Sequence, residues 1–158
     1  MASVVREFIE YSGLADYMPN NPVSFKQISI QENLSIPVTK PDMEQIVKVM
    51  CEVYITNTRV IKTPKATSLE GQKLTGWKVI IEGEIKQKIE YSAHEPTQSL
   101  HAVHFNVPFS SFIILPEDFV VGTPISVQGY IEDIFVKKID KTHIFKNISI
   151  LLNAEFCE

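Results

Sequence analysis

Cysteine is scarce in this sequence, with Cys51 and Cys157 the two present among 158 residues. Small secreted domains that depend on disulfides carry many more, so a disulfide framework is excluded. A chain of this length can bury about two thirds of the surface that its unfolded form exposes, which allows a hydrophobic core without metal or disulfide support. We therefore expect one domain with free thiols, made in a reducing compartment. A single bridge that closes a long loop is the alternative.

The sequence also lacks an excess of positive charge and long apolar runs. Fifteen Lys and Arg stand against nineteen Asp and Glu, giving a net charge of −4, and the basic residues are scattered. Nucleic-acid-binding surfaces concentrate such residues, so no nucleic-acid partner is expected. The sequence has no run of about eighteen apolar residues, which a transmembrane helix needs. Arg6, Glu7 and Glu10 interrupt the N-terminus where a secretion signal has its apolar core, so neither a transmembrane segment nor a signal peptide is expected.

Isoleucine and valine are abundant instead and make up about a fifth of the residues. Side chains branched at Cβ are stiff in helices and fit the pleated surface of a sheet. Apolar and polar residues alternate with a period of two over residues 45–56 and 77–91, which predicts two strands. In the first, the predicted apolar face consists of Val47, Val49, Cys51, Val53 and Ile55. Gly83 in the second indicates a bulge or a closely approaching neighbour.

Further strands are predicted along the rest of the chain, over residues 24–30, 58–62, 100–107, 109–115, 125–136 and 143–156. About seven or eight strands with short connections favour an all-β fold, an antiparallel β-sandwich, with a barrel-like arrangement as the variant. We expect this domain to span residues 25–158, preceded by an N-terminal arm and linker of residues 1–24.

The first part of this arm is predicted to be a short amphipathic helix. Ser3 is a suitable N-cap residue and Gly13 a suitable stop. The apolar stripe of the helix consists of Val4, Val5, Phe8 and Ile9. Because about ten residues of helix are marginal alone, the arm must dock, either on its own sandwich or on a neighbouring copy. These four residues are the candidate assembly interface.

Patterns typical of catalysis or metal binding are not found in the sequence. His101 and His104 form a histidine pair at short spacing, but positions three apart on a strand point to opposite faces and cannot chelate one ion. Glu82 and Glu84 share the solvent face of a strand, which is typical of solvated charge rather than of a catalytic pair. Neither a nucleophile elbow nor a phosphate-binding loop is present. We expect no catalytic residues, no metal, no cofactor and no enzymatic activity.

Exposed aromatic rings are another means by which β-sandwich and single-strand-binding proteins hold ligands. Trp77 lies on the apolar face of its strand and is predicted to belong to the core. Tyr54 and Tyr130 fall on the faces opposite the main apolar rows of their strands. These two tyrosines are therefore the candidates for exposed contact with a partner.

Several segments follow one another in an order and spacing that point to a known family. They are IPVTKPD at 36–42, QIVKVMCEVYI at 45–55, VIKTP at 60–64, EGQKLTGWKVIIEGEIKQKIEY at 70–91, QSLHAVH at 98–104 and VPFSSFIILP at 107–116. Together they resemble the SPOCS domain family, the domain repeated in the clostridial spore-coat morphogenetic protein SipL. The resemblance runs from about Phe25 to the C-terminus.

The resemblance implies an interaction domain without catalytic or cofactor residues, in a protein that helps to build the endospore envelope. Unlike SipL, this sequence has one such domain and no peptidoglycan-binding LysM module, so SipL's docking partner does not carry over. We expect a non-enzymatic structural subunit that is made in the cytoplasm and deposited on the spore envelope or in an extracellular assembly. It would self-associate into a layer or filament, with itself or other spore-envelope proteins as partners. The alternative is a monomeric interaction module that recruits another spore-coat protein or a cell-wall glycan.

Overall fold

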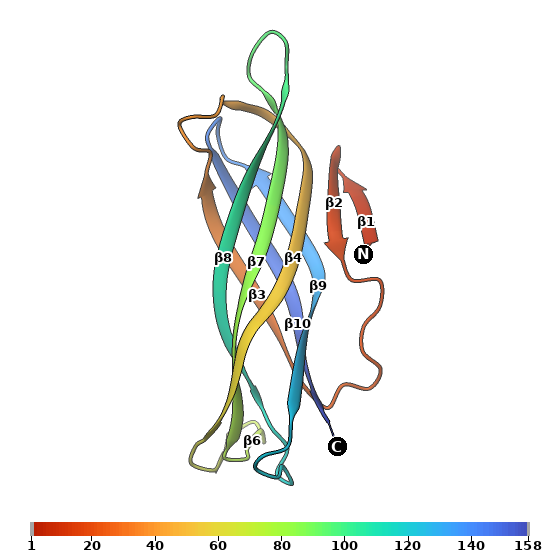
Figure 1. Ribbon diagram of the computed structural model, residues 1–158, viewed down its shortest axis with the longest axis vertical. Helices are drawn as coiled ribbons and strands as arrows, with labels where there is room; N and C mark the ends of the chain where they lie inside the picture. The colour runs from red at the N-terminus through yellow and green to blue at the C-terminus, as the bar shows by residue number, and fades with distance from the viewer. Residues whose placement is uncertain (1, 158) are drawn as a thin grey trace.

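Two β-sheets packed face to face make up most of the molecule (Figure 1). The computed structural model describes residues 2–157, which contain strands but no helix that could cross a membrane. The strands are β1 (Ala2–Arg6), β2 (Ile9–Leu14), β3 (Ser24–Ser35), β4 (Met43–Lys62), β5 (Ala66–Thr67), β6 (Lys73–Leu74), β7 (Trp77–Ala93), β8 (Leu100–Ile114), β9 (Ile125–Lys138) and β10 (His143–Phe156). The large sheet has the order β1-β2-β4-β7-β8, the small sheet the order β3-β10-β9, and β5 and β6 form a short separate hairpin.

The predicted antiparallel β-sandwich is confirmed. Neighbouring strands run antiparallel in both sheets, except that β2 and β4 run parallel. Two pairs of predicted strands are continuous, because residues 45–56 and 58–62 both lie in β4, and 100–107 and most of 109–115 lie in β8. β8 continues without a break past Pro108, which has no N–H group. This is tolerated because β8 is an edge strand of the large sheet.

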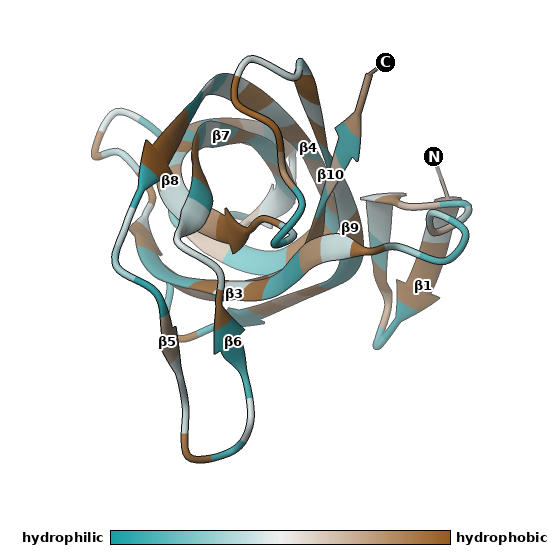
Figure 2. Cartoon of the chain, turned by 90° about the horizontal axis from the view of Figure 1, so that it is seen from below, coloured by the Kyte–Doolittle hydropathy of each residue, from teal (hydrophilic) through white to brown (hydrophobic). Residues whose placement is uncertain are grey.

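The core lies between the two sheets and consists largely of isoleucine. Ile81, Ile85 and Ile89 on the inner face of β7 have no exposed surface, and burying each contributes about 2 kcal/mol relative to leaving it in water. Trp77 packs against this core, as predicted, with its ring 5.7 Å from that of Phe119. Figure 2 shows the two sheets enclosing the interior and the β1–β2 hairpin lying outside it, beside β9.

The alternation predicted for residues 45–56 is correct from Val49 onward and wrong before it. From Val49 the predicted residues face the core. Between Ile46 and Lys48 the pairing of β4 with β7 shifts register, so that Ile46 is buried and Val47 is half-buried. A β-bulge adds one residue to a strand and so exchanges the two faces, which a strict period of two cannot foresee.

The close approach predicted at Gly83 is confirmed. A Cβ atom at this position would lie 2.5 Å from the Phe109 ring and 2.6 Å from the carbonyl oxygen of Tyr54. Opposite Gly83, β4 shifts register between Ile55 and Asn57. The glycine therefore lets a bulged strand and an aromatic ring pack directly on the backbone of β7.

The predicted N-terminal helix is wrong, because residues 2–14 form an antiparallel β-hairpin. Glu7 and Phe8 make its turn, with φ values of 50° and 66°, as in a two-residue turn of type I′. A ten-residue helix is marginal in water, whereas β2 gains hydrogen bonds by pairing with the open edge of β4. The β-branched residues on either side of the turn also suit strands better than a helix.

The hairpin docks on its own sandwich and contacts both sheets. β2 pairs with β4 over residues 10–12. Beyond β2, the Ala15 amide donates a hydrogen bond of 2.9 Å to the Ile131 carbonyl of β9. Arg6 reaches the same strand and forms an ion pair of 3.1 Å with Asp133. The arm therefore bridges the large sheet and the small sheet on one side of the sandwich.

Candidate functional site

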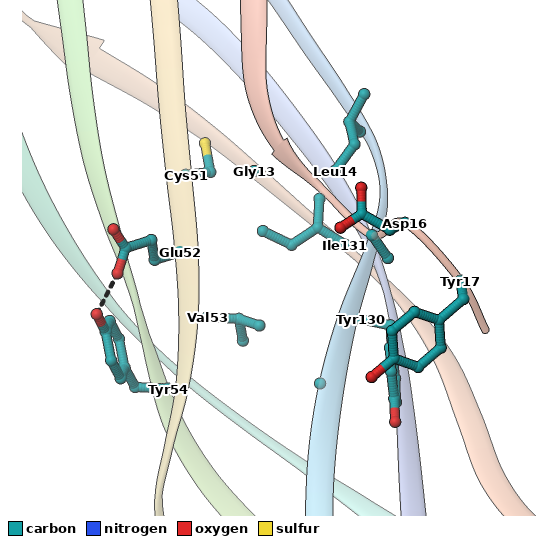
Figure 3. A pocket seen from close by; sticks show the side chains of 12 residues that line it. Gly13, Leu14, Asp16, Tyr17, Cys51, Glu52, Val53, Tyr54, Tyr130 and Ile131 are labelled. Carbon is teal, nitrogen blue, oxygen red and sulfur yellow. Dashed lines mark hydrogen bonds between the residues drawn. The ribbon is translucent and has the colours of Figure 1, made fainter. Parts of the chain in front are cut away.

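A groove opens where β4 and β9 approach each other across the two sheets (Figure 3). It has a volume of about 320 Å³ and is lined by residues 13–17 of the arm, 51–54 of β4 and 129–131 of β9. Val53 and Ile131 point toward each other across it (Figure 3). Apolar side chains on facing strands give the groove the character of a site for another apolar side chain or strand.

The arm closes one end of this groove through a glycine. Gly13 has a φ of +112°, and a Cβ atom there would lie 2.0 Å from the carbonyl oxygen of Cys51. No other residue fits this combination of backbone angle and contact. The close approach places the end of β2 directly against β4, and the groove begins where β2 ends.

Tyr54, one of the two tyrosines predicted to contact a partner, lies at the rim of the groove and is 42% exposed. Its ring points away from β9 (Figure 3), and Lys86 Nζ lies 4.9 Å from the ring centre. The hydroxyl donates a hydrogen bond to the Glu52 carboxylate, and this bond raises the pKa of Tyr54 above its usual value. Contact between this tyrosine and a partner stays a prediction.

Tyr130, the second predicted tyrosine, is half-buried at the opposite rim. Its ring lies edge-on to that of Tyr17, with 6.2 Å between the ring centres, and its hydroxyl donates a hydrogen bond of 2.8 Å to Gln128. Burial is the main cause of its raised pKa. The structure therefore brings Tyr54 and Tyr130 to one groove but not into contact. Sequence reasoning missed Tyr17, whose one signal is an aromatic residue in a connector rich in Pro and Asn.

The four apolar residues predicted to form one helical stripe are divided by the hairpin. Ile9 packs against the core and Val4 is half-buried. Val5 is 69% exposed, and Phe8 at the turn is 86% exposed. The arm therefore uses part of its apolar surface to dock on its own sandwich and leaves Val5 and Phe8 in contact with solvent. An assembly interface at these residues stays a prediction.

His101 and Glu84 each contact residues nearby in sequence or on the neighbouring strand. His101 stacks on Tyr91 and lies 3.0 Å from the hydroxyl of Ser99. Glu84 lies 3.7 Å from Lys86 in an ion pair on the same strand. Within residues 2–157, no three His, Cys, Asp or Glu side chains come together in an arrangement that could hold a metal ion.

The two cysteines are free thiols in different environments. Cys51 is buried on β4, and Cys157 is exposed near the C-terminal end. Burial raises the pKa of Cys51 to about 12. At neutral pH this thiol is therefore protonated, and a protonated thiol is a poor nucleophile.

Comparison with known protein families finds a match to one family. The model of the SipL SPOCS domain matches residues 42–139, which is more than half of the chain and contains β4 to β9. The arm, β3 and nearly all of the connection to β4 precede the matched range, and β10 follows it. No curated protein and no solved structure matches the chain.

Proposed function

Because the chain belongs to the SipL SPOCS domain family, we propose that it is a non-enzymatic structural protein of the endospore envelope that self-associates through its N-terminal hairpin. The family is associated with sporulation and the spore coat, which supports the location. The observation that carries self-association is the exposed hairpin, which presents Val5 and Phe8 to solvent.

The free edge of β1 supports the N-terminal hairpin as the contact between copies. β1 is the outermost strand of the large sheet, and no other strand within residues 2–157 pairs with its outer edge. Unpaired edges invite pairing with another chain, and proteins that stay monomeric guard them with Lys, Pro or strong bulges. Residues 2–6 contain neither Lys nor Pro, and their one register irregularity lies at the start of the strand, between Ala2 and Ser3.

The opposite edge of the large sheet is less accessible. β8 carries Pro108 in its middle, which cannot donate a hydrogen bond. β3 of the small sheet also packs against β8, and Lys26 Nζ lies 3.4 Å from the ring centre of Phe112. A neighbouring copy would receive the hairpin at the groove between β4 and β9, where β9 is an edge strand of the small sheet. A contact between two different surfaces of this kind generates an open filament when the rotation does not close a ring.

A pair of substitutions tests this contact between copies. The double variant Val5→Thr, Phe8→Ser removes exposed apolar surface and leaves the docked residues of the arm in place. We expect the wild-type protein to form assemblies that grow with concentration in sedimentation velocity, and the double variant to need a concentration at least about tenfold higher, since the loss of about 1.5–3 kcal/mol of apolar contact weakens association by that factor.

Leu69→Ser is the matched control, because Leu69 is fully exposed in the loop between β5 and β6, far from the hairpin in the chain. It should assemble like the wild type. If the double variant also assembles like the wild type, the hairpin is not the contact between copies. A wild-type protein that stays monomeric at every concentration would show that the chain does not self-associate.

A monomeric interaction module is the second candidate, and the groove is the observation that favours it. Tyr17, Tyr54 and Tyr130 supply aromatic surface at its two rims. In that case the variants Tyr54→Ala and Tyr130→Ala would retain the fold but lose binding to peptidoglycan fragments or to a purified spore-coat protein. Unchanged binding by both variants would place the contact elsewhere.

A further inference from the structure

The two sheets present different outer faces to solvent. In the large sheet, the outer face of β7 carries charged side chains, which are Lys78, Glu82, Glu84, Lys86, Lys88 and Glu90. In the small sheet, the corresponding alternate positions carry uncharged side chains, which are Ser29, Gln31 and Asn33 of β3, Phe145 and Asn147 of β10, and Phe135 of β9. We call these six residues the neutral face.

Strand pairing places carboxamides and aromatic rings side by side on the neutral face. Asn147 is directly opposite both Gln31 of β3 and Phe135 of β9, and the side chains of directly opposite residues share a face of the sheet. Phe135 is 44% exposed, and its ring lies edge-on to that of Phe145, with 6.2 Å between the ring centres. An exposed ring therefore borders a row of carboxamides.

The uncharged surface is long and narrow. Every second residue of β3 from Gln27 to Ser35 is uncharged and exposed. Strands rise about 3.4 Å per residue and neighbouring strands lie about 4.8 Å apart, so this surface is about 27 Å long and, across three strands, about 10 Å wide. These proportions suit an extended polymer rather than a small molecule.

The charged side chains that border the neutral face along its length belong, within residues 2–157, to β9. Glu132 accepts a hydrogen bond of 2.9 Å from Gln27, and Asp133 forms its ion pair with Arg6. Lys137 is the third charged residue on this side. Because charges of both signs are present and the acids are already partnered, the surface offers a charged ligand no net attraction.

The carboxamides of the neutral face retain hydrogen-bonding capacity. Ser29 donates a hydrogen bond to Asn147 Oδ1, whereas the side chains of Gln31 and Asn33 have no hydrogen-bond partner among the described residues. A carboxamide both donates and accepts hydrogen bonds, as a hydroxyl group does, whereas a carboxylate only accepts and an ammonium group only donates. The free groups therefore match a ligand rich in hydroxyls.

We propose that the neutral face binds a neutral polysaccharide, an extended chain of β-1,4-linked pyranose rings that lies along β3 and β10. The ring of Phe135 supplies apolar area for the C–H face of a sugar ring, and Gln31, Asn33 and Asn147 hydrogen-bond to the hydroxyl groups. This proposal goes beyond self-association. It also concerns a different surface from the groove between β4 and β9, because no residue of the neutral face lines that groove.

A second copy stacked on the neutral face is the competing occupant, because rows of Asn and Gln can stack between sheets. Packing between sheets depends on interdigitating apolar side chains, and Phe135 is the one member of the neutral face that is both apolar and exposed, since Phe145 is half-buried. The polar groups would lose water without apolar compensation. A chain with hydroxyls along its whole length replaces that water with hydrogen bonds instead.

The test is affinity electrophoresis of the full-length protein in native gels that contain hydroxyethyl cellulose or glycol chitin, two neutral polymers. Carboxymethyl cellulose is the charged match. We expect both neutral polymers to retard the protein, and carboxymethyl cellulose to retard it less, because the protein has a net charge of −4 and the polymer is an anion.

Phe135→Ala and Gln31→Ala should each raise the Kd for the neutral polymers at least about fivefold, since each removes one contact to the sugar chain. Gln31 is exposed, so its substitution leaves the core intact even if Phe135→Ala does not fold. Leu100→Ala is the matched control, because it removes a side chain that is 69% exposed on β8 of the large sheet. It should bind like the wild type.

Four outcomes would overturn the proposal. One is a wild-type protein that neither neutral polymer retards. Another is unchanged retardation of both Phe135→Ala and Gln31→Ala, which would place the binding elsewhere. The third is equal retardation by carboxymethyl cellulose. The fourth is loss of self-association in Phe135→Ala without any polysaccharide binding by the wild type, which would make the neutral face a contact between copies. Self-association is measured separately by sedimentation velocity, so the two proposals can fail independently.

Discussion

At the scale of single residues, glycines determine where segments can approach one another. Gly13 allows the end of β2 to lie against the backbone of Cys51, and Gly83 allows Phe109 to lie on β7. The requirement at Gly83 could be predicted, because a glycine within a regular alternation is conspicuous. The requirement at Gly13 could not, because it depends on where the arm docks, and a glycine after an apolar segment is equally typical of a helix end.

Gly13→Ala should detach the arm from the sandwich. The added Cβ atom would lie 2.0 Å from the Cys51 carbonyl oxygen, and the φ of +112° is unfavourable for alanine. We expect hydrogen exchange of the amides in residues 9–15 to become at least about tenfold faster, which corresponds to about 1.4 kcal/mol. The amides of β7 should keep their protection.

Gly122→Ala is the matched control for this substitution. Gly122 also has a positive φ, +91°, but a Cβ atom there would meet nothing within 4 Å. It should therefore cost about 1 kcal/mol of backbone strain and leave the arm protected. If the arm exchanges at the same rate in both variants, the close packing of Gly13 on Cys51 is not what keeps the arm docked.

At the scale of elements, the accuracy of each prediction from the sequence depended on how strictly the apolar residues of the segment follow one spacing, that of a strand or that of a helix. β7 was predicted well because its alternation is uninterrupted over many residues. The arm was not, because Val4, Val5, Phe8 and Ile9 fit one face of a helix and equally well the two strands of a hairpin with a turn at residues 7–8. The open edge of β4 decides between these structures, and this edge exists only in the folded sandwich. The turn sequence, Glu-Phe, is also unlike the Asn-Gly or Asp-Gly that typically marks such a hairpin.

The double substitution Glu7→Asn, Phe8→Gly should stabilise the hairpin. Both positions have positive φ, which Asn and Gly adopt at lower cost than Glu and Phe. We expect slower hydrogen exchange in β1 and β2 by a factor that corresponds to about 1 kcal/mol. A helical arm would respond in the opposite direction, because glycine in a helix costs about 1 kcal/mol relative to alanine. Faster exchange in this variant would therefore contradict the hairpin.

At the scale of the whole molecule, the two long sides of the sandwich differ. On one side β3 packs against β8, and on the other the arm spans from β4 to β9 and leaves the groove open below it. Tyr54 and Tyr130 at the rims could be singled out from the alternation of their strands. Tyr17 and the groove itself could not, because the groove is formed by three segments far apart in the sequence. The burial of Lys146 and Gln87 could not be predicted either, because both are polar residues at positions that face the core only in the folded sandwich.

Negative-stain electron microscopy of the purified full-length protein over a range of concentrations tests self-association through the hairpin most directly. We predict regular filaments or layers that form above a threshold concentration and are absent when residues 2–14 are deleted. The deletion removes β1 and β2, and with them the free edge of β1, Val5 and Phe8. It retains β4, β7 and β8 of the large sheet and all three strands of the small sheet. Single particles at every concentration, or assemblies that persist without the hairpin, would contradict the account.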